Sequence, residues 1–96
     1  MKTMDLLRKN RKKILTLAKK HGVKDVRVFG SVAREEDNKD SDIDLLINLA
    51  EKRETYGFLR FKRGVEELVG RNVDIVFESG IYHLIKDSIL EDSRPI

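Results

Sequence analysis

The polar segment between Gly30 and Asp44 constrains the fold of this chain more than any other, because an apolar run lies on each side of it. Residues 26–29 (VRVF) precede the segment, and residues 42–47 (DIDLLI) overlap its end. Both runs are rich in β-branched or aromatic residues, which predicts two strands, over 25–29 and 42–48, joined by a polar connection. A strand that stops at Gly30-Ser31 is typical of a turn that meets a phosphate-sized ligand.

Two carboxylates stand at alternate positions of the second predicted strand. Asp42 and Asp44 therefore project from one face, while the apolar residues between and after them project from the other. Like charges held side by side repel, and a divalent metal relieves that repulsion; hard carboxylate oxygens suit Mg²⁺. A lone Asp-x-Asp is more often a solvated strand face or a turn. The preceding Gly-Ser turn and Arg34 favour the metal-binding interpretation.

Three residues after the first strand suit a nucleoside triphosphate. Gly30 has no Cβ, so its backbone can approach phosphate oxygens closely. Ser31 supplies a hydroxyl and is expected to cap a short helix running through Arg34 and Glu35, whose free N–H groups would face the anion. Arg34 can bind a phosphate in fork geometry.

With these features, the chain resembles a minimal nucleotidyltransferase (MNT) domain of the DNA polymerase β-like superfamily, whose signature is Gly-Ser, a spacer and Asp-x-Asp on the next strand. The resemblance covers nearly the whole chain and implies one domain over residues 1–96. The fold that it implies is α/β (α+β), with a small mixed sheet of three or more strands flanked by helices. Relatives often carry Gly directly after the arginine, where this chain has Glu35 and then Glu36. These acids are either harmless helix-end charges or weaken triphosphate binding.

The resemblance also assigns roles to further residues. Asp74 interrupts the apolar run 72–77, a third predicted strand, and looks like the family's third carboxylate. The alternative for Asp74 is an edge-strand aspartate that meets solvent. The family's chemistry implies two Mg²⁺ ions, one held by Asp42, Asp44 and Asp74 and the other by Asp42, Asp44 and the triphosphate. Gly30, Ser31, Arg34 and Ser41 complete the expected nucleotide-binding set.

Helical spacing of apolar residues predicts three longer helices. The first, over 3–21, carries many Lys and Arg residues outside its apolar stripe, which form either a solvated face or a surface for nucleic acid or an acidic partner. The second, over 56–69, ends at Gly70, and the third, over 80–91, begins at a Ser79 cap. Residues 50–55 are expected to form a loop, and 92–96 a tail.

The absence of cysteine excludes a disulfide framework and a thiolate zinc site. With no signal peptide and no long apolar run, we expect a soluble, cytoplasmic protein without membrane contact. A net charge of +3 gives weak support to nucleic-acid binding, and no aromatic residues interleave with the basic ones, so direct binding is not expected.

The resemblance implies transfer of AMP from ATP to a hydroxyl. We expect no residues to remain for an acceptor-binding domain, so a partner must bring that hydroxyl. In the resembled family the partner is a HEPN toxin, an RNA-cleaving protein that the MNT antitoxin silences by adenylylating a tyrosine, which predicts a hetero-oligomer. Two alternatives stay open: a non-catalytic subunit that neutralises its partner by contact, and a nucleic-acid-binding module that uses the first helix.

Overall fold

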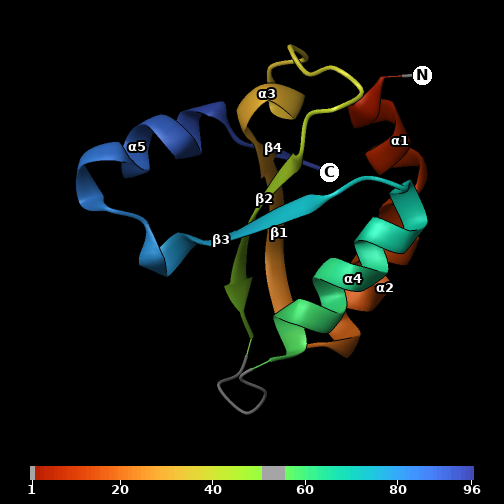
Figure 1. Ribbon diagram of the computed structural model, residues 1–96. Helices are drawn as coiled ribbons and strands as arrows, with labels where there is room; N and C mark the ends of the chain where they lie inside the picture. Colours follow the sequence, from red (N-terminus) through yellow and green to blue (C-terminus); the bar gives the residue numbers. More distant parts are fainter. Residues whose placement is uncertain (1, 51–55) are drawn as a thin grey trace.

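A four-stranded mixed sheet forms the centre of the computed structural model, which describes residues 2–50 and 56–96 (Figure 1). The strand order is β3-β2-β1-β4; β2 pairs in parallel with β3, while β1 pairs antiparallel with both β2 and β4. The strands are β1 (Val23–Phe29), β2 (Ile43–Leu49), β3 (Val73–Phe77) and β4 (Arg94–Pro95). The predicted mixed sheet flanked by helices is confirmed.

The helices lie on both sides of this sheet. Three of them, α1 (Thr3–Lys9), α2 (Arg11–Lys20) and α4 (Gly57–Val69), lie on one side. The short α3 (Gly30–Ala33) connects β1 toward β2, and η1 (Glu78–Gly80) and α5 (His83–Asp92) lie on the other side (Figure 1). We call the face that carries α2 and α4 the inner face, and the opposite one the outer face.

The core lies between the inner face and the two long helices. Ile43, Leu45 and Ile47 of β2 are completely buried, as the predicted alternation requires. From the helix layer, Ile14 of α2 and Phe61 of α4 are also completely buried. The inner face is thus fully apolar, and Asp44, at an alternate position of β2, is directed to the outer face.

A β-bulge at Asp25 extends the first strand beyond its predicted start. The register against β2 shifts between Lys24 and Arg27, and Asp25 has a φ of 55°. In a regular strand, side chains three positions apart point to opposite faces. The inserted residue shifts this alternation, so Val23 and Val26 are both buried on the same face. The bulge therefore adds a core residue to β1.

The predicted first helix is divided in two at Asn10. The backbone N–H of Asn10 bonds to the carbonyls of both Leu6 and Leu7, and its side-chain amide donates to Leu6 O at 2.9 Å. Asparagine competes in this way for backbone groups that a continuous helix would use. The second predicted helix is confirmed, and Gly70 ends it in the left-handed conformation, with a φ of 67°.

Two predictions for the end of the chain were wrong. The last helix begins at His83 and has no side-chain cap; Ser79 lies instead in the 3₁₀ turn η1. Residues 94–95 are not a tail but the edge strand β4, held because Arg27 Nε donates to Ser93 Oγ at 2.7 Å. Pro95 is compatible with an edge position, where no ladder hydrogen bond from it is needed.

The loop predicted over 50–55 falls outside the described residues except for Ala50. In the ranges 2–50 and 56–96, no helix combines the length and the apolar character needed to cross a membrane.

Candidate active site

Three aspartates lie near one another where β2 and β3 begin. Asp42 directly precedes β2, Asp44 lies in β2, and Asp74 lies in β3 directly opposite Asp44 in the parallel register. Their neighbours Ile43 and Val73 also oppose each other and point into the core, so the two paired aspartates share the outer face. The structure thus brings together the three carboxylates that the sequence singled out.

The electrostatics of Asp44 reflect this proximity. Partial burial raises the pKa of the Asp44 carboxyl above its ordinary value, and the charges of Asp74 and then Asp42 raise it further, while Arg34 opposes the shift. The ionised cluster is therefore destabilising in the protein alone, and a cation would relieve it.

The raised pKa of Asp44 predicts a pH-dependent gain of stability in Asp44→Asn. The folded protein binds this proton more tightly than the unfolded chain, so wild-type stability falls as the pH rises from the unfolded pKa through the raised folded pKa, and the loss is complete above both. At pH 7 we expect Asp44→Asn to be more stable by up to about 1 kcal/mol, a figure limited by solvent screening of a partly exposed carboxyl.

Urea denaturation at a series of pH values measures this gain, which should shrink as the pH falls to the ordinary aspartate range. The exposed Asp87, replaced by Asn, is the control and should show a much smaller change. A loss of stability at pH 7 in Asp44→Asn would contradict the repulsion described here.

Gly30 stands against the Asp44 carboxylate. It has a φ of 72°, in the region that favours glycine, and a Cβ added there would overlap Asp44 Oδ2 and lie 3.3 Å from Asp44 Cγ. The sequence predicted Gly30 as a close approach for phosphate; the structure adds that its missing side chain leaves room for Asp44. Ser31 lies inside α3 rather than at its cap, which is Phe29, so the predicted side-chain cap is not formed.

Arg34 is positioned directly after α3 and is held by two acids. Its Nε donates to Glu36 Oε2 at 3.0 Å, and its Nη1 bonds to Asp92 Oδ2 at the end of α5. These hydrogen bonds raise the already high pKa of the Arg34 guanidinium, so it stays charged. The positive charge of Arg34 acts on Asp44 and opposes the rise in the pKa of its carboxyl.

The two acids after Arg34 have separate contacts. Glu35 has a φ of 58°, in the left-handed region that glycine adopts without strain, which explains why the resembled family often carries Gly there. Its carboxylate lies 3.7 Å from Lys2 Nζ. Of these two acids, only Glu36 contacts Arg34, the residue predicted to bind phosphate.

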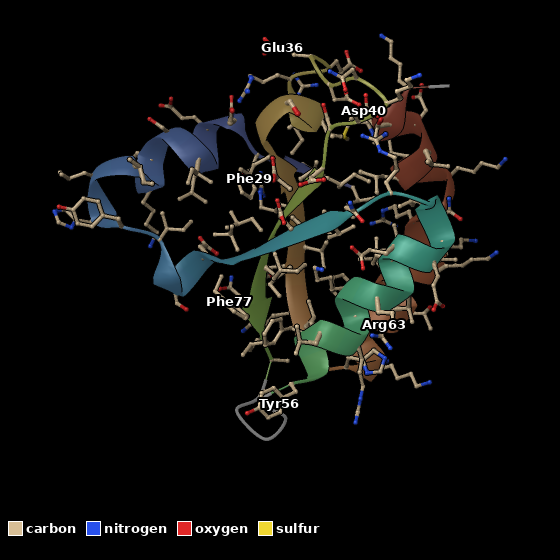
Figure 2. The ribbon with its side chains drawn as sticks, viewed as in Figure 1. Phe29, Glu36, Asp40, Tyr56, Arg63 and Phe77 are labelled. Atoms are coloured by element: carbon tan, nitrogen blue, oxygen red, sulfur yellow. The ribbon has the colours of Figure 1, made fainter. Side chains whose placement is uncertain are left out.

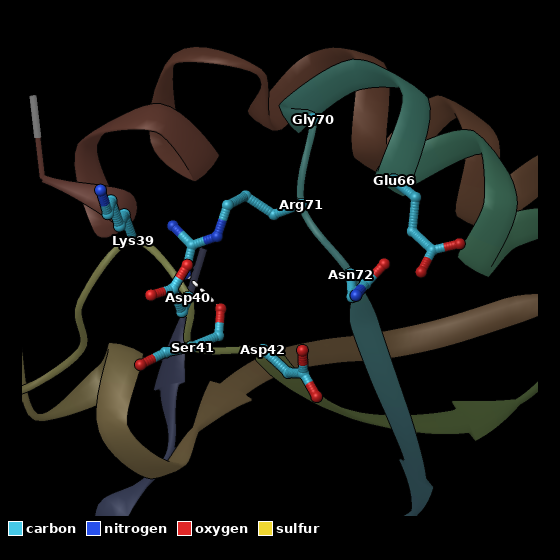
Figure 3. Close-up of a pocket in the computed structure, with 8 residues that line it drawn as sticks. All are labelled: Lys39, Asp40, Ser41, Asp42, Glu66, Gly70, Arg71 and Asn72. Atoms are coloured by element: carbon cyan, nitrogen blue, oxygen red, sulfur yellow. Dashed lines mark hydrogen bonds between the residues drawn. The ribbon is translucent and has the colours of Figure 1, made fainter.

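A polar cleft of about 380 Å³ adjoins the aspartates on the side of α4 (Figure 3). Asp42 and Ser41 line it, together with Glu66 and with Arg71 and Asn72, which lead into β3. Asp44 and Asp74 do not line it. The candidate active site is therefore defined by the register of β2 and β3 and by the raised pKa of Asp44, and not by this cleft. Asp42 belongs both to the group of aspartates and to the lining of the cleft.

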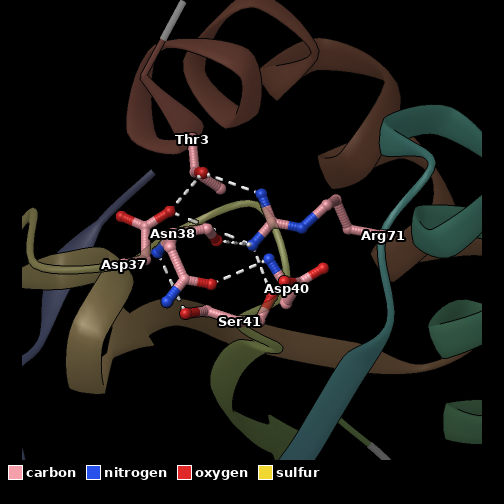
Figure 4. A network of polar contacts seen from close by, with 6 residues as sticks. All are labelled: Thr3, Asp37, Asn38, Asp40, Ser41 and Arg71. Carbon is pink, nitrogen blue, oxygen red and sulfur yellow. Dashed lines mark hydrogen bonds and ion pairs between the residues drawn. The ribbon is translucent and has the colours of Figure 1, made fainter.

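Arg71, which sequence reasoning missed, holds the chain that leads to Asp42 (Figure 4). Its Nη1 donates to Thr3 Oγ1 at 3.0 Å, and its Nη2 donates to the carbonyls of Asn38, at 3.1 Å, and Ser41. Thr3 in turn donates to Asp37 at 2.5 Å. Ser41 Oγ accepts the Asn38 N–H at 3.0 Å, so this predicted nucleotide ligand is also part of the loop's own structure.

The polar connection around this network, with Glu36 and Asp40 at its surface, lies at the end of the sheet opposite Phe77 (Figure 2). A single arginine between Gly70 and a strand gives no local signal for such a role, because its partners lie 30 or more positions away.

Carboxylate oxygens are the ligands that Mg²⁺ prefers, and the charges of Asp74 and Asp42 add to the burial that raises the pKa of Asp44. Within the described parts of the chain, no three Asp, Glu, His or Cys side chains converge closely enough to enclose a metal ion. The donor set therefore fits Mg²⁺ in chemistry, and enclosing the ion would require the aspartate side chains to turn toward one another.

Comparison with known proteins gives a consistent result. Residues 7–96 match the family described as the nucleotidyltransferase domain. A Methanocaldococcus jannaschii protein, provisionally named a protein adenylyltransferase, is 39% identical over 86% of this chain and 89% of its own length. The protein adenylyltransferase MntA of Thermococcus cleftensis is 34% identical over 79% of this chain and 77% of its own length.

Solved structures show the same fold. A provisionally named minimal nucleotidyltransferase superposes with a TM-score of 0.84 at 41% identity, covering 96% of this chain and 94% of the other. A toxin–antitoxin structure with AMP-PNP has a TM-score of 0.70 at 17% identity, over 88% of this chain and 70% of the other. A tri-AMPylated Shewanella oneidensis HEPN toxin in complex with an MNT antitoxin has a TM-score of 0.63 at 16% identity, over 91% of this chain and 68% of the other. For the last two structures, at 17% and 16% identity, the likeness shows a shared fold and nothing more.

Proposed function

This chain belongs to the nucleotidyltransferase domain family, and from that premise we propose that it transfers AMP from ATP to a hydroxyl group of a separately encoded protein. The observation that carries the proposal is the pairing of Asp44 with Asp74 on adjacent parallel strands, beside the Gly30-Ser31 turn. Residues 1–96 would form one such domain. The names of the relatives, protein adenylyltransferases, support the choice of AMP as the group transferred.

We propose further that the acceptor is a tyrosine of a HEPN-type toxin, and that the chain acts as its antitoxin. Support comes from a protein of the same fold, the MNT antitoxin whose HEPN toxin partner is AMPylated. A tyrosine hydroxyl has a pKa of about 10, so it needs help to lose its proton near neutral pH.

In the proposed reaction, the acceptor oxygen bonds to the α-phosphorus of ATP and the bond to the bridging oxygen breaks, releasing pyrophosphate. Gly30, Ser31, Arg34 and Ser41 would bind the triphosphate and orient the α-phosphorus for in-line attack. To reach a phosphate, Arg34 would exchange its present contacts with Glu36 and Asp92. Asp74 would take the proton of the acceptor hydroxyl.

Asp42, Asp44 and Asp74 would hold Mg²⁺. When bound, two Mg²⁺ ions would lower the pKa of the acceptor hydroxyl and neutralise the charge of the leaving pyrophosphate. The chain's own contribution is to hold three carboxylates at the start of two strands, where their mutual repulsion favours cation binding.

The test is incubation of the chain with ATP, Mg²⁺ and a candidate HEPN-type partner protein, followed by intact-mass spectrometry. We expect the partner to gain the mass of AMP and pyrophosphate to appear, with neither change in EDTA. In calorimetry, ATP should bind with Mg²⁺ and give little heat without it, because the aspartates and the triphosphate repel one another.

A second candidate, neutralisation by contact alone, is favoured by one observation. Arg34, the expected phosphate ligand, is already bound to two acids. This candidate predicts a stable complex in which the partner stays unmodified and no pyrophosphate forms. If the wild-type chain gave that result, neutralisation by contact would replace AMP transfer as the proposed function.

A further inference from the structure

Helix α5 packs only loosely against the rest of the fold. It has ten residues, from His83 to Asp92, none of them buried, and no side-chain hydrogen bond caps its N-terminus. Isolated helices shorter than about 12–15 residues are marginal in water, and helices in proteins gain most of their stability from packing. The rest of this chain supplies little of that packing to α5.

Large apolar side chains are exposed at the beginning of this helix. Tyr82, Leu84 and Ile85 are 59%, 70% and 50% exposed, and we call these three residues the α5 surface. They are three of the five large hydrophobic residues found exposed in the described ranges, and they are consecutive or nearly so in sequence. Clustered apolar exposure of this kind is typical of a surface that another protein covers.

Helix α5 runs from the α5 surface, at its N-terminal end, toward the candidate active site, near its C-terminal end. Helix α5 lies on the same outer side of the sheet as Asp44 and Asp74, and its last residue, Asp92, bonds to Arg34 beside those carboxylates (Figure 1). An acceptor hydroxyl that reaches Asp44 and Asp74 at the outer face therefore approaches on the side of the sheet that carries α5. The basic residues of α2, such as Lys12 and Lys13, lie on the opposite side of the sheet.

We propose that the α5 surface is the docking site of the acceptor protein, and that this protein presents an apolar patch bordered by Lys or Arg next to the hydroxyl that receives AMP. The inference rests on the proposed function. The basic border follows from charge, because α5 carries three acidic side chains, Asp87, Glu91 and Asp92, and one basic side chain, Lys86. Two copies of this chain facing each other through α5 would bring acidic groups together, which disfavours self-association there.

The test compares two double variants that place the same charge change on opposite sides of the sheet. Leu84→Glu with Ile85→Glu alters the α5 surface, and Lys12→Gln with Lys13→Gln alters α2. Titration calorimetry with the candidate HEPN-type partner measures docking, and calorimetry with ATP and Mg²⁺ shows whether each variant keeps an intact site. Analytical ultracentrifugation of the wild-type chain alone gives its oligomeric state.

We expect the α5 variant to bind the partner at least about tenfold more weakly, because charged groups would be buried against its apolar patch. ATP binding should stay within about twofold of wild type in both variants, and the α2 variant should bind the partner within about threefold, as rim charges usually permit. Docking that survives in the α5 variant, or is lost in the α2 variant, overturns the proposal.

A wild-type dimer that the α5 substitutions dissociate would assign the surface to a second copy instead, and a wild-type chain that binds no partner would also overturn the docking proposal. Failure of the proposed function is recognised separately. In that case the wild-type complex forms through α5 while the partner gains no AMP.

Discussion

Asp74→Asn is expected to slow AMP transfer by about a hundredfold or more, the range that a positioned general base contributes, while ATP still binds. Asp74 lies opposite Asp44 on the edge strand β3, and it is exposed, so it can meet an acceptor that approaches from the outer face. Asparagine keeps the shape of the side chain but cannot accept the proton of the acceptor hydroxyl. Asp42 and Asp44 remain to hold ATP with Mg²⁺, so its affinity should change only a few fold.

A time course of intact-mass spectra of the partner measures the rate, and calorimetry with ATP and Mg²⁺ measures the affinity. The matched control is Asp5→Asn, because Asp5 is an exposed aspartate of α1, on the inner side of the sheet. Near wild-type transfer by Asp74→Asn would remove Asp74 from the reaction. Equal losses of rate and ATP affinity would make it a nucleotide ligand only.

Gly30→Ala is expected to abolish most activity at a small cost in stability, whereas Gly22→Ala has only the cost in stability. The two glycines have nearly the same φ, 72° and 71°, so an alanine strains the backbone equally, by about 1 kcal/mol. A Cβ at Gly22 meets open space, but at Gly30 it overlaps the carboxylate of Asp44. The Asp44 side chain can rotate away from this Cβ, so the overlap adds little to the loss of stability. It does displace the Asp44 carboxylate, which is proposed to hold the metal.

A displacement of about 1 Å at a catalytic group can reduce a rate about a hundredfold, and we expect a loss of that size in Gly30→Ala alone. Urea denaturation should give similar losses of stability for the two variants, and the transfer assay should separate them. If both variants kept wild-type activity, the close approach of Gly30 to Asp44 would have no role in catalysis.

The parts of the fold that depend on local pattern could be predicted from the sequence. The alternation Asp42-Ile43-Asp44-Leu45 fixed which face of β2 is apolar, since side chains alternate along any strand. Gly70 marked the end of α4 because glycine adopts the left-handed conformation that ends helices. The pairing of Asp44 with Asp74 followed from the family resemblance, since strand order is not a local property.

The features that the sequence did not reveal depend on distant partners. Arg71 holds the segment before Asp42 through Thr3 and Ser41, and β4 is held through a hydrogen bond between Arg27 and Ser93. Neither arginine has a local pattern that distinguishes it from a solvated surface residue. Helix α5 differs from the prediction in another way: its apolar periodicity is real, but Leu84 and Ile85 are exposed, and Ile89 and Leu90 are only half-buried.

The position of β4 at the edge of the sheet has a consequence for synthesis of the protein. Ser93 pairs with Arg27, 66 positions earlier, so the ribosome must deliver that whole length before β4 can join β1. During this interval the edge of β1 that later pairs with β4 has unpaired backbone groups. These groups are a template for strands of other nascent chains. We therefore expect early misassociation at this edge of β1 to lower the yield of folded protein in a crowded cell.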